Sequence, residues 1–111
     1  MSDYQPDKWV MIKITGVEDN PVYKVFACWY GGYLGSDSWK LNSGVTKATI
    51  SGLVYSFEGS SGSVYHCHKD FYGTSGYGGG VLQNMIDKAK ENNITIEILD
   101  EDTNFLEINY E

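Results

Sequence analysis

The segment His66-Cys67-His68 contains both histidines and one of the two cysteines of the chain. If it is a strand, His66 and His68 leave one face and Cys67 the other. Two imidazoles on one face can begin a zinc site, which needs a third or fourth ligand. Cys28 and Asp70 are candidates, but neither stands at a motif spacing from His66. Zinc binding at His66 and His68 is therefore one alternative, beside histidines that pack next to tyrosines and titrate near neutrality.

A glycine-rich stretch, residues 73–80, precedes the helical pattern of the chain. Backbone N–H groups at a helix N-terminus attract anions, and neighbouring tyrosines can stack on a base. The spacing matches neither a Walker A loop nor a dinucleotide-binding fingerprint. A small anion or nucleotide is thus a second alternative, beside a connector whose glycines allow positive φ. Its predicted ligand-binding residues are Tyr72, Tyr77, Gly78, Gly79 and Gly80.

The net charge of −7 is concentrated at the C-terminal end. Residues 1–90 contain eight lysines and eight acidic residues, so the whole excess lies in residues 91–111. A β-hairpin over these last residues would display acids on its turn and on its outward faces. The hairpin is either a solvated, charged edge or an acidic surface that docks on a basic partner. The predicted acidic binding residues are Glu97, Asp100, Glu101, Asp102 and Glu107.

Aromatic residues surround a glycine-containing segment, residues 29–39. Tyrosine and tryptophan dominate binding hot spots in protein interfaces, and glycine lets a loop present them. We predict that Tyr33 and Trp39 are exposed and contribute to protein binding.

The composition excludes several classes of function. The chain has no arginine and a negative net charge, and both count against nucleic-acid binding on electrostatic grounds. No apolar run approaches the roughly 20 residues of a membrane helix, and the start does not resemble a secretory signal. Two cysteines do not form a disulfide framework, so we expect a cytoplasmic protein with reduced thiols. No triad, paired carboxylates or cofactor motif is evident. We therefore expect no enzyme and no cofactor, and homo-oligomerisation is left open.

The hydrophobic periodicity predicts one α+β domain over residues 1–111, with residues 1–7 as a flexible N-terminus. Apolar residues from Val81 to Ala89 recur on one face of a helix, predicted over 81–92 with a cap at Asn92-Asn93. The expected architecture is a twisted antiparallel sheet of about six or seven strands with this helix packed on it. The predicted strands are 9–14, 22–30, 38–41, 45–50, a hairpin over 51–65, 94–98 and 106–110.

Two segments, Tyr23–Gly44 and Gly59–Lys69, resemble a group of small uncharacterised tailed-bacteriophage proteins. The resemblance covers about the central half of the chain and carries no established activity or site residue. It implies a small early or accessory phage protein in the bacterial cytoplasm, where such proteins often bind and inhibit a host factor. We therefore predict a non-enzymatic interaction protein that binds a host protein through its acidic hairpin and exposed aromatics.

Overall fold

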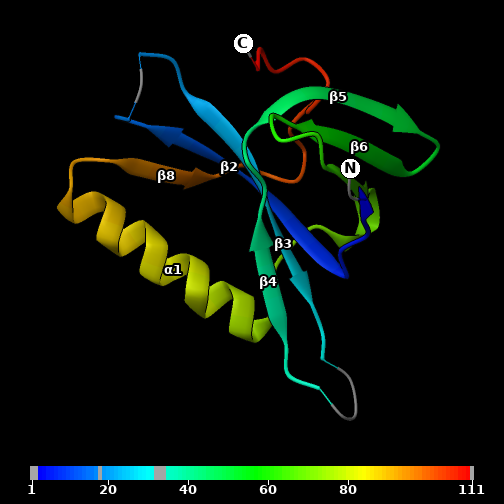
Figure 1. The fold of residues 1–111 in the computed structure, drawn as a ribbon, viewed down its shortest axis with the longest axis horizontal. Helices are drawn as coiled ribbons and strands as arrows, with labels where there is room; N and C mark the ends of the chain where they lie inside the picture. The colour runs from blue at the N-terminus through cyan, green and yellow to red at the C-terminus, as the bar shows by residue number, and fades with distance from the viewer. Residues whose placement is uncertain (1–2, 18, 32–34, 111) are drawn as a thin grey trace.

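The computed structural model describes residues 3–17, 19–31 and 35–110, which form an α+β fold (Figure 1). The fold class predicted from the sequence is therefore confirmed. Within these residues the elements are β1 (Asp3–Tyr4), β2 (Lys8–Thr15), β3 (Val22–Trp29), β4 (Ser38–Leu41), β5 (Val45–Ser51), β6 (Val54–Gly59), β7 (Val64–His68), the short 3-10 helix η1 (Lys69–Phe71), α1 (Gly76–Glu91) and β8 (Thr95–Ile98).

The strands form two sheets, not the single antiparallel sheet predicted from the sequence. Sheet A has the order β1-β7-β6-β5 and sheet B the order β4-β3-β2-β8. Sheet A is mixed, because β1 runs parallel to β7. The chain leaves sheet B between β4 and β5, where Gly44 has a φ of 133°. Buried Asn42 holds this bend in place, since its side-chain oxygen accepts a hydrogen bond from the N–H of Val25 at 2.9 Å.

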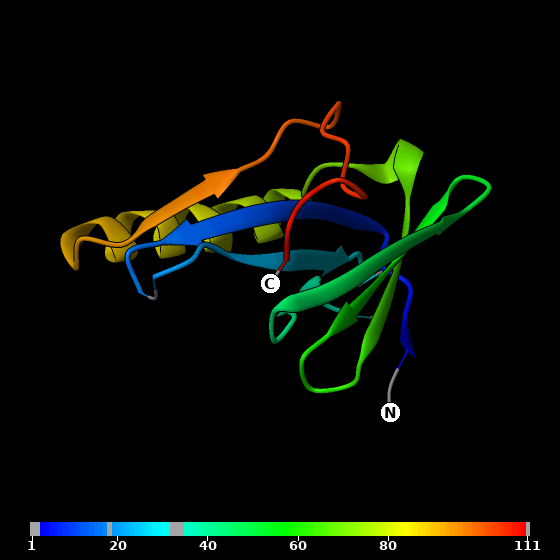
Figure 2. The same ribbon diagram turned by 90° about the horizontal axis from the view of Figure 1, so that it is seen from above.

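Sheet B is the central layer, with α1 on one face and sheet A on the other. Alternate residues of β2 supply both cores, because Val10 and Ile12 face α1 whereas Trp9 and Met11 face sheet A. Figure 2 shows the green strands of sheet A crossing only one end of sheet B. The core between the sheets contains Trp9, Met11, Val25, Ala27, Val45, Tyr55, Phe57, Tyr65, Cys67 and Phe105.

Residues 3–7 have defined partners, in contrast to the flexible N-terminus that the sequence predicted. Asp3 and Tyr4 pair with β7, and Pro6 is buried. The carboxylate of Asp7 accepts a hydrogen bond from the N–H of Tyr30 at 2.9 Å. The N-terminal segment thereby connects the outer strand of sheet A to sheet B.

The helix begins five residues earlier than predicted, at Gly76. Ser75 caps it, because its hydroxyl oxygen accepts a hydrogen bond from the N–H of Gly78 at 2.9 Å. The periodicity missed this turn because glycine has low helix propensity, which capping and packing outweigh here. At the other end, Asn93 has a φ of 61°, in agreement with the predicted cap at Asn92-Asn93. In the part of the chain that the structure describes, no helix has the length and hydrophobicity needed to span a membrane.

The predictions of a strand over residues 106–110 and of an acidic hairpin are wrong. β8 pairs with β2 in sheet B, and the residues after it form turns. Asn104 directs the chain into these turns, since its side-chain oxygen accepts the N–H of Leu106 at 3.2 Å and its carbonyl accepts the N–H of Glu107. As a result Phe105 is buried in the core between the sheets, whereas Leu106 is 44% exposed.

Candidate functional site

The acidic turn, residues 100–102, follows β8 and is exposed to solvent. Leu99, just before it, is held by two hydrogen bonds. Its N–H donates to the carbonyl of Met11 at 3.0 Å, and its carbonyl accepts from the hydroxyl of Tyr72 at 2.6 Å. The turn is therefore positioned by the core, although its own side chains remain in water.

A hollow of about 180 Å³ lies beside the acidic turn. Its lining includes Asp70 of η1, which the sequence did not predict as part of this acidic surface. Glu101 and Asp102 also line it, with Lys69 as a positively charged neighbour. With Asp100 of the same turn, four acidic residues and one lysine give a local charge of −3. Negative charge from two distant segments is thus concentrated on one surface.

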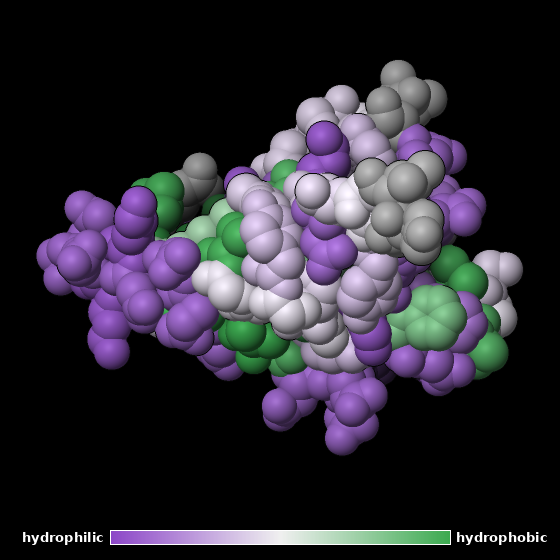
Figure 3. All heavy atoms as spheres, turned by 90° about the horizontal axis from the view of Figure 1, so that it is seen from below, coloured by the Kyte–Doolittle hydropathy of each residue, from purple (hydrophilic) through white to green (hydrophobic). Residues whose placement is uncertain are grey.

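Two exposed apolar side chains adjoin this charge at η1. Leu53 in the β5–β6 turn is 54% exposed and Phe71 is 46% exposed. The N–H of Lys69 donates to the carbonyl of Leu53 at 2.8 Å, which holds the β5–β6 turn against η1. Figure 3 shows apolar side chains on the surface at the end of the molecule that carries this turn. We call the acidic turn, Asp70, Leu53 and Phe71 together the acidic–apolar face.

The structure does not align the other two predicted acidic residues with the acidic turn along one hairpin. Glu97 lies on β8 opposite Lys13 of β2. Glu107 is exposed within the C-terminal turns, where its N–H donates to the carbonyl of Asn104 at 3.1 Å. The predicted grouping of Glu97 and Glu107 required a hairpin between β8 and the C-terminal residues. It is wrong because β8 pairs with β2 in sheet B instead.

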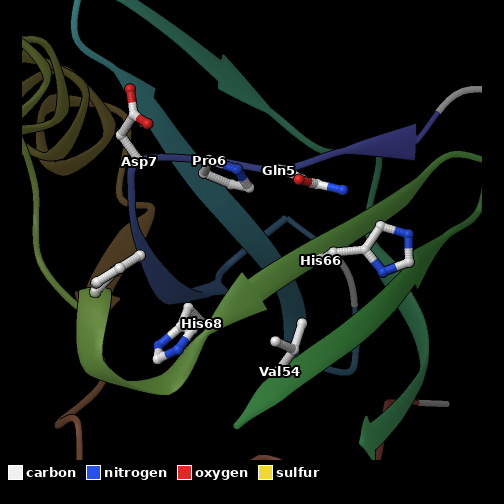
Figure 4. Close-up of a pocket in the computed structure, with 7 residues that line it drawn as sticks. Gln5, Pro6, Asp7, Val54, His66 and His68 are labelled. Carbon is white, nitrogen blue, oxygen red and sulfur yellow. The ribbon is translucent and has the colours of Figure 1, made fainter.

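The two histidines lie on the face of β7 that points away from the core, and Cys67 is buried on the other face, as strand alternation predicted. They line a hollow of about 470 Å³ (Figure 4). The imidazole of His66 extends toward Asp3, whereas Nδ1 of His68 accepts the N–H of Asp70 at 3.1 Å. No group of three metal-ligating side chains occurs among the described residues. This geometry does not support the zinc alternative.

Three strands of sheet A bring together Ser56, His66 and Asp3, an arrangement that their distant sequence positions did not reveal. Nδ1 of His66 is 3.0 Å from the hydroxyl of Ser56, and Nε2 is 3.4 Å from a carboxylate oxygen of Asp3. Ser56 lies on β6, which pairs with β5 and β7, so the backbone N–H groups beside it belong to the ladders. A nucleophilic serine needs such donors for the oxyanion. We therefore interpret the arrangement as a link between β1 and the rest of sheet A.

Most of the predicted ligand-binding residues before and within α1 make packing contacts or hydrogen bonds that stabilise the fold. The ring of Tyr72 lies perpendicular to Trp9 at 4.7 Å, and its hydroxyl also accepts the N–H of Met11. Gly78 is packed against Cys28, and the N–H of Gly79 donates to the carbonyl of Ser75 at 2.8 Å. Exposed positions remain at Tyr77 and Gly80. The arrangement favours close helix packing over a nucleotide-binding cradle as the reason for the glycines.

The predicted aromatic residues are only partly described by the structure. Tyr33 lies outside the described residues. Trp39 is 37% exposed on β4, and one face of its ring stacks on Phe26 at 5.5 Å between ring centroids. β4 and β8 are opposite edges of sheet B, so Trp39 does not belong to the acidic–apolar face.

Three buried or partly buried tyrosines, Tyr65, Tyr72 and Tyr110, make stability depend on pH. The pKa of Tyr72 is raised from 10.0 to about 12, mainly by burial; the hydrogen bond from Met11 opposes this rise, and the charges of Asp100 and Glu101 add to it. Burial likewise raises the pKa of Tyr65 to about 12 and raises that of Tyr110. Above pH 10.0 the unfolded chain therefore loses these protons while the folded protein keeps them.

We expect the free energy of unfolding to fall as pH rises from about 10 to about 12, because the unfolded state binds fewer protons there. Guanidinium denaturation at a series of pH values measures this slope. The slope should be shallower in Tyr72→Phe. The matched control is Tyr77→Phe, which removes a phenol that is 52% exposed and should keep the wild-type slope. Equal slopes in wild type and Tyr72→Phe would contradict the assignment.

No protein-family model, curated protein or solved structure matches the chain. The site is therefore interpreted from its own geometry.

Proposed function

We propose that the protein is a non-enzymatic interaction protein that binds a basic surface of another protein through the acidic–apolar face. The observation that supports this most is that the acidic turn and Asp70 converge on one hollow, while the exposed Phe71 follows Asp70 in η1 and the exposed Leu53 is joined to η1 by a backbone hydrogen bond. Opposite charge on a partner would steer its approach and set its orientation. The apolar pair would supply contact area that loses water on binding.

The resemblance to phage accessory proteins directs this proposal to a bacterial host protein, which the chain would inhibit or modulate in the cytoplasm. Cys28 and Cys67 are free and buried, which is in keeping with a reducing compartment. Lack of arginine and the charge of −7 disfavour nucleic acid as the partner.

Charge reversal tests the acidic turn. The triple variant Asp100→Lys/Glu101→Lys/Asp102→Lys is expected to weaken partner binding at least about tenfold, or ~1.4 kcal/mol, because repulsion replaces attraction. Affinity capture from bacterial lysate, quantified by mass spectrometry, identifies proteins retained by the wild type. Titration calorimetry with the purified captured protein then gives the dissociation constants. Binding should also weaken at higher salt, since exposed charges are screened.

The control applies the same charge change elsewhere. Asp19, Asp87 and Glu91 are exposed acidic residues outside the acidic–apolar face. Their triple lysine variant should bind the partner like the wild type, whereas Phe71→Ser should bind more weakly. Equal loss of binding in both lysine variants would show that only net charge matters, and the proposed face would be refuted.

A further inference from the structure

The last strand of sheet A, β5, has an unoccupied edge. β5 ends the strand order of sheet A, and within the described ranges its outer side pairs with no other strand (Figure 1). It is the longest of the four edge strands, with seven residues against two in β1 and four each in β4 and β8. Five of its residues, Thr46, Lys47, Thr49, Ile50 and Ser51, are exposed. Such an edge is a template for another strand.

The β5–β6 hairpin determines which backbone groups point outward. Its two-residue turn, Gly52-Leu53, makes Ser51 and Val54 a hydrogen-bonded pair, and such pairs alternate along an antiparallel ladder. Thr49 therefore exchanges hydrogen bonds with β6. The N–H and C=O groups of the intervening residues, Ala48 and Ile50, point to the free edge.

We propose that β5 pairs antiparallel with β5 of a second copy of this chain, about a twofold axis at Thr49. In this register Ala48 exchanges two hydrogen bonds with Ile50 of the second copy, and Ile50 exchanges two with Ala48 of that copy. The two sheets A then form one continuous sheet, in an isologous dimer.

The side chains of β5 are self-complementary in this register. Thr49 faces Thr49 of the second copy at a non-hydrogen-bonded position, where threonine pairs are favourable. Lys47 faces Ser51, so no like charges stand directly opposite each other. Ile50, 38% exposed on the side of the sheet that faces the core, gains Ala48 of the second copy as a neighbour. The shorter edge strand β8, in contrast, carries the acidic Glu97.

The charge variant Thr49→Lys tests this register, because in the dimer it places two lysines opposite each other. In the monomer, the single lysine lies on an exposed surface and should be tolerated. Sedimentation equilibrium of the wild type over increasing concentration should show the mass rising from 12.4 kDa toward twice that value. Thr49→Lys should remain at 12.4 kDa. The control Thr95→Lys, on the exposed surface of β8, should dimerise like the wild type. Circular dichroism checks that both variants fold.

Cysteine cross-linking provides an independent test. Facing residues at a non-hydrogen-bonded position have Cα atoms about 4.5 Å apart, within disulfide range. Under mild oxidation with diamide, Thr49→Cys should give a covalent dimer, whereas Lys47→Cys should not, because its counterpart lies further along the strand. The native Cys28 and Cys67 are fully buried and do not compete. A wild type that stays monomeric, a Thr49→Lys protein that still dimerises, or equal cross-linking at both positions would overturn the proposal.

Discussion

Replacing Phe105 with alanine is expected to lower the free energy of unfolding by about 3–5 kcal/mol, the range for a large aromatic removed from a core. The side chain is 1% exposed. Its ring lies 5.3 Å from that of Trp9 and 5.4 Å from that of Tyr55, with Phe57 and Tyr72 also in contact range. The C-terminal turns thus insert a central core residue between the two sheets. Chemical denaturation of the purified variant measures the loss.

Leu106→Ala is the matched control, because Leu106 is the next residue in the chain and belongs to the segment 106–110 that the sequence predicted as a strand. Leu106 is 44% exposed, so its truncation should change stability by no more than about 0.5 kcal/mol. A larger loss of stability in Leu106→Ala than in Phe105→Ala would contradict the burial of Phe105 between the two sheets.

Gly78→Ala is expected to lower the free energy of unfolding by about 1–3 kcal/mol, the usual cost of overpacking a core. A Cβ atom at this position would lie 2.3 Å from the sulfur of Cys28, which is fully buried on β3. Either α1 moves away from sheet B or Cys28 leaves its rotamer, and both lose packing. Thermal and denaturant unfolding of the variant report this cost.

Gly80→Ala, two residues further along the same helix, should have the opposite effect. A Cβ atom there meets no atom within 4 Å, so the substitution brings only the helix propensity of alanine, a gain of up to about 1 kcal/mol. A double variant Gly78→Ala/Cys28→Ala should recover part of the loss, because it removes the clashing sulfur. Stabilisation by Gly78→Ala would refute the close approach of α1 to β3.

The candidate site was predicted from the sequence only in part. The acidic turn was evident because its three acids are consecutive in the chain, and the structure leaves them exposed. Asp70 and Leu53 carried no signal for this site, because their relation to the turn exists only where η1 packs beside the β5–β6 turn. Phe71, a large aromatic flanked by polar residues, was the one member that composition alone could have suggested.

The grouping of Glu97 and Glu107 failed for a reason that applies to other sequences. An alternating pattern states which side chains can share a face, but it does not state which strand provides the hydrogen-bond partner. β8 pairs with β2, which lies far earlier in the chain. The side chain of Asn104 accepts a hydrogen bond from the N–H of Leu106, which favours a turn over a strand in the residues that follow.

Sequence patterns were sufficient to predict the α+β class, the main strands, the C-terminal end of the helix and the sides of β7 on which His66, Cys67 and His68 lie. These follow from short-range periodicity and capping, which depend on neighbours a few residues apart. The division into two sheets, the parallel pairing of β1, the burial of Phe105 and the acidic–apolar face could not be predicted from such patterns. Each depends on contacts between distant segments, whose free energy comes from burying surface that no local pattern records.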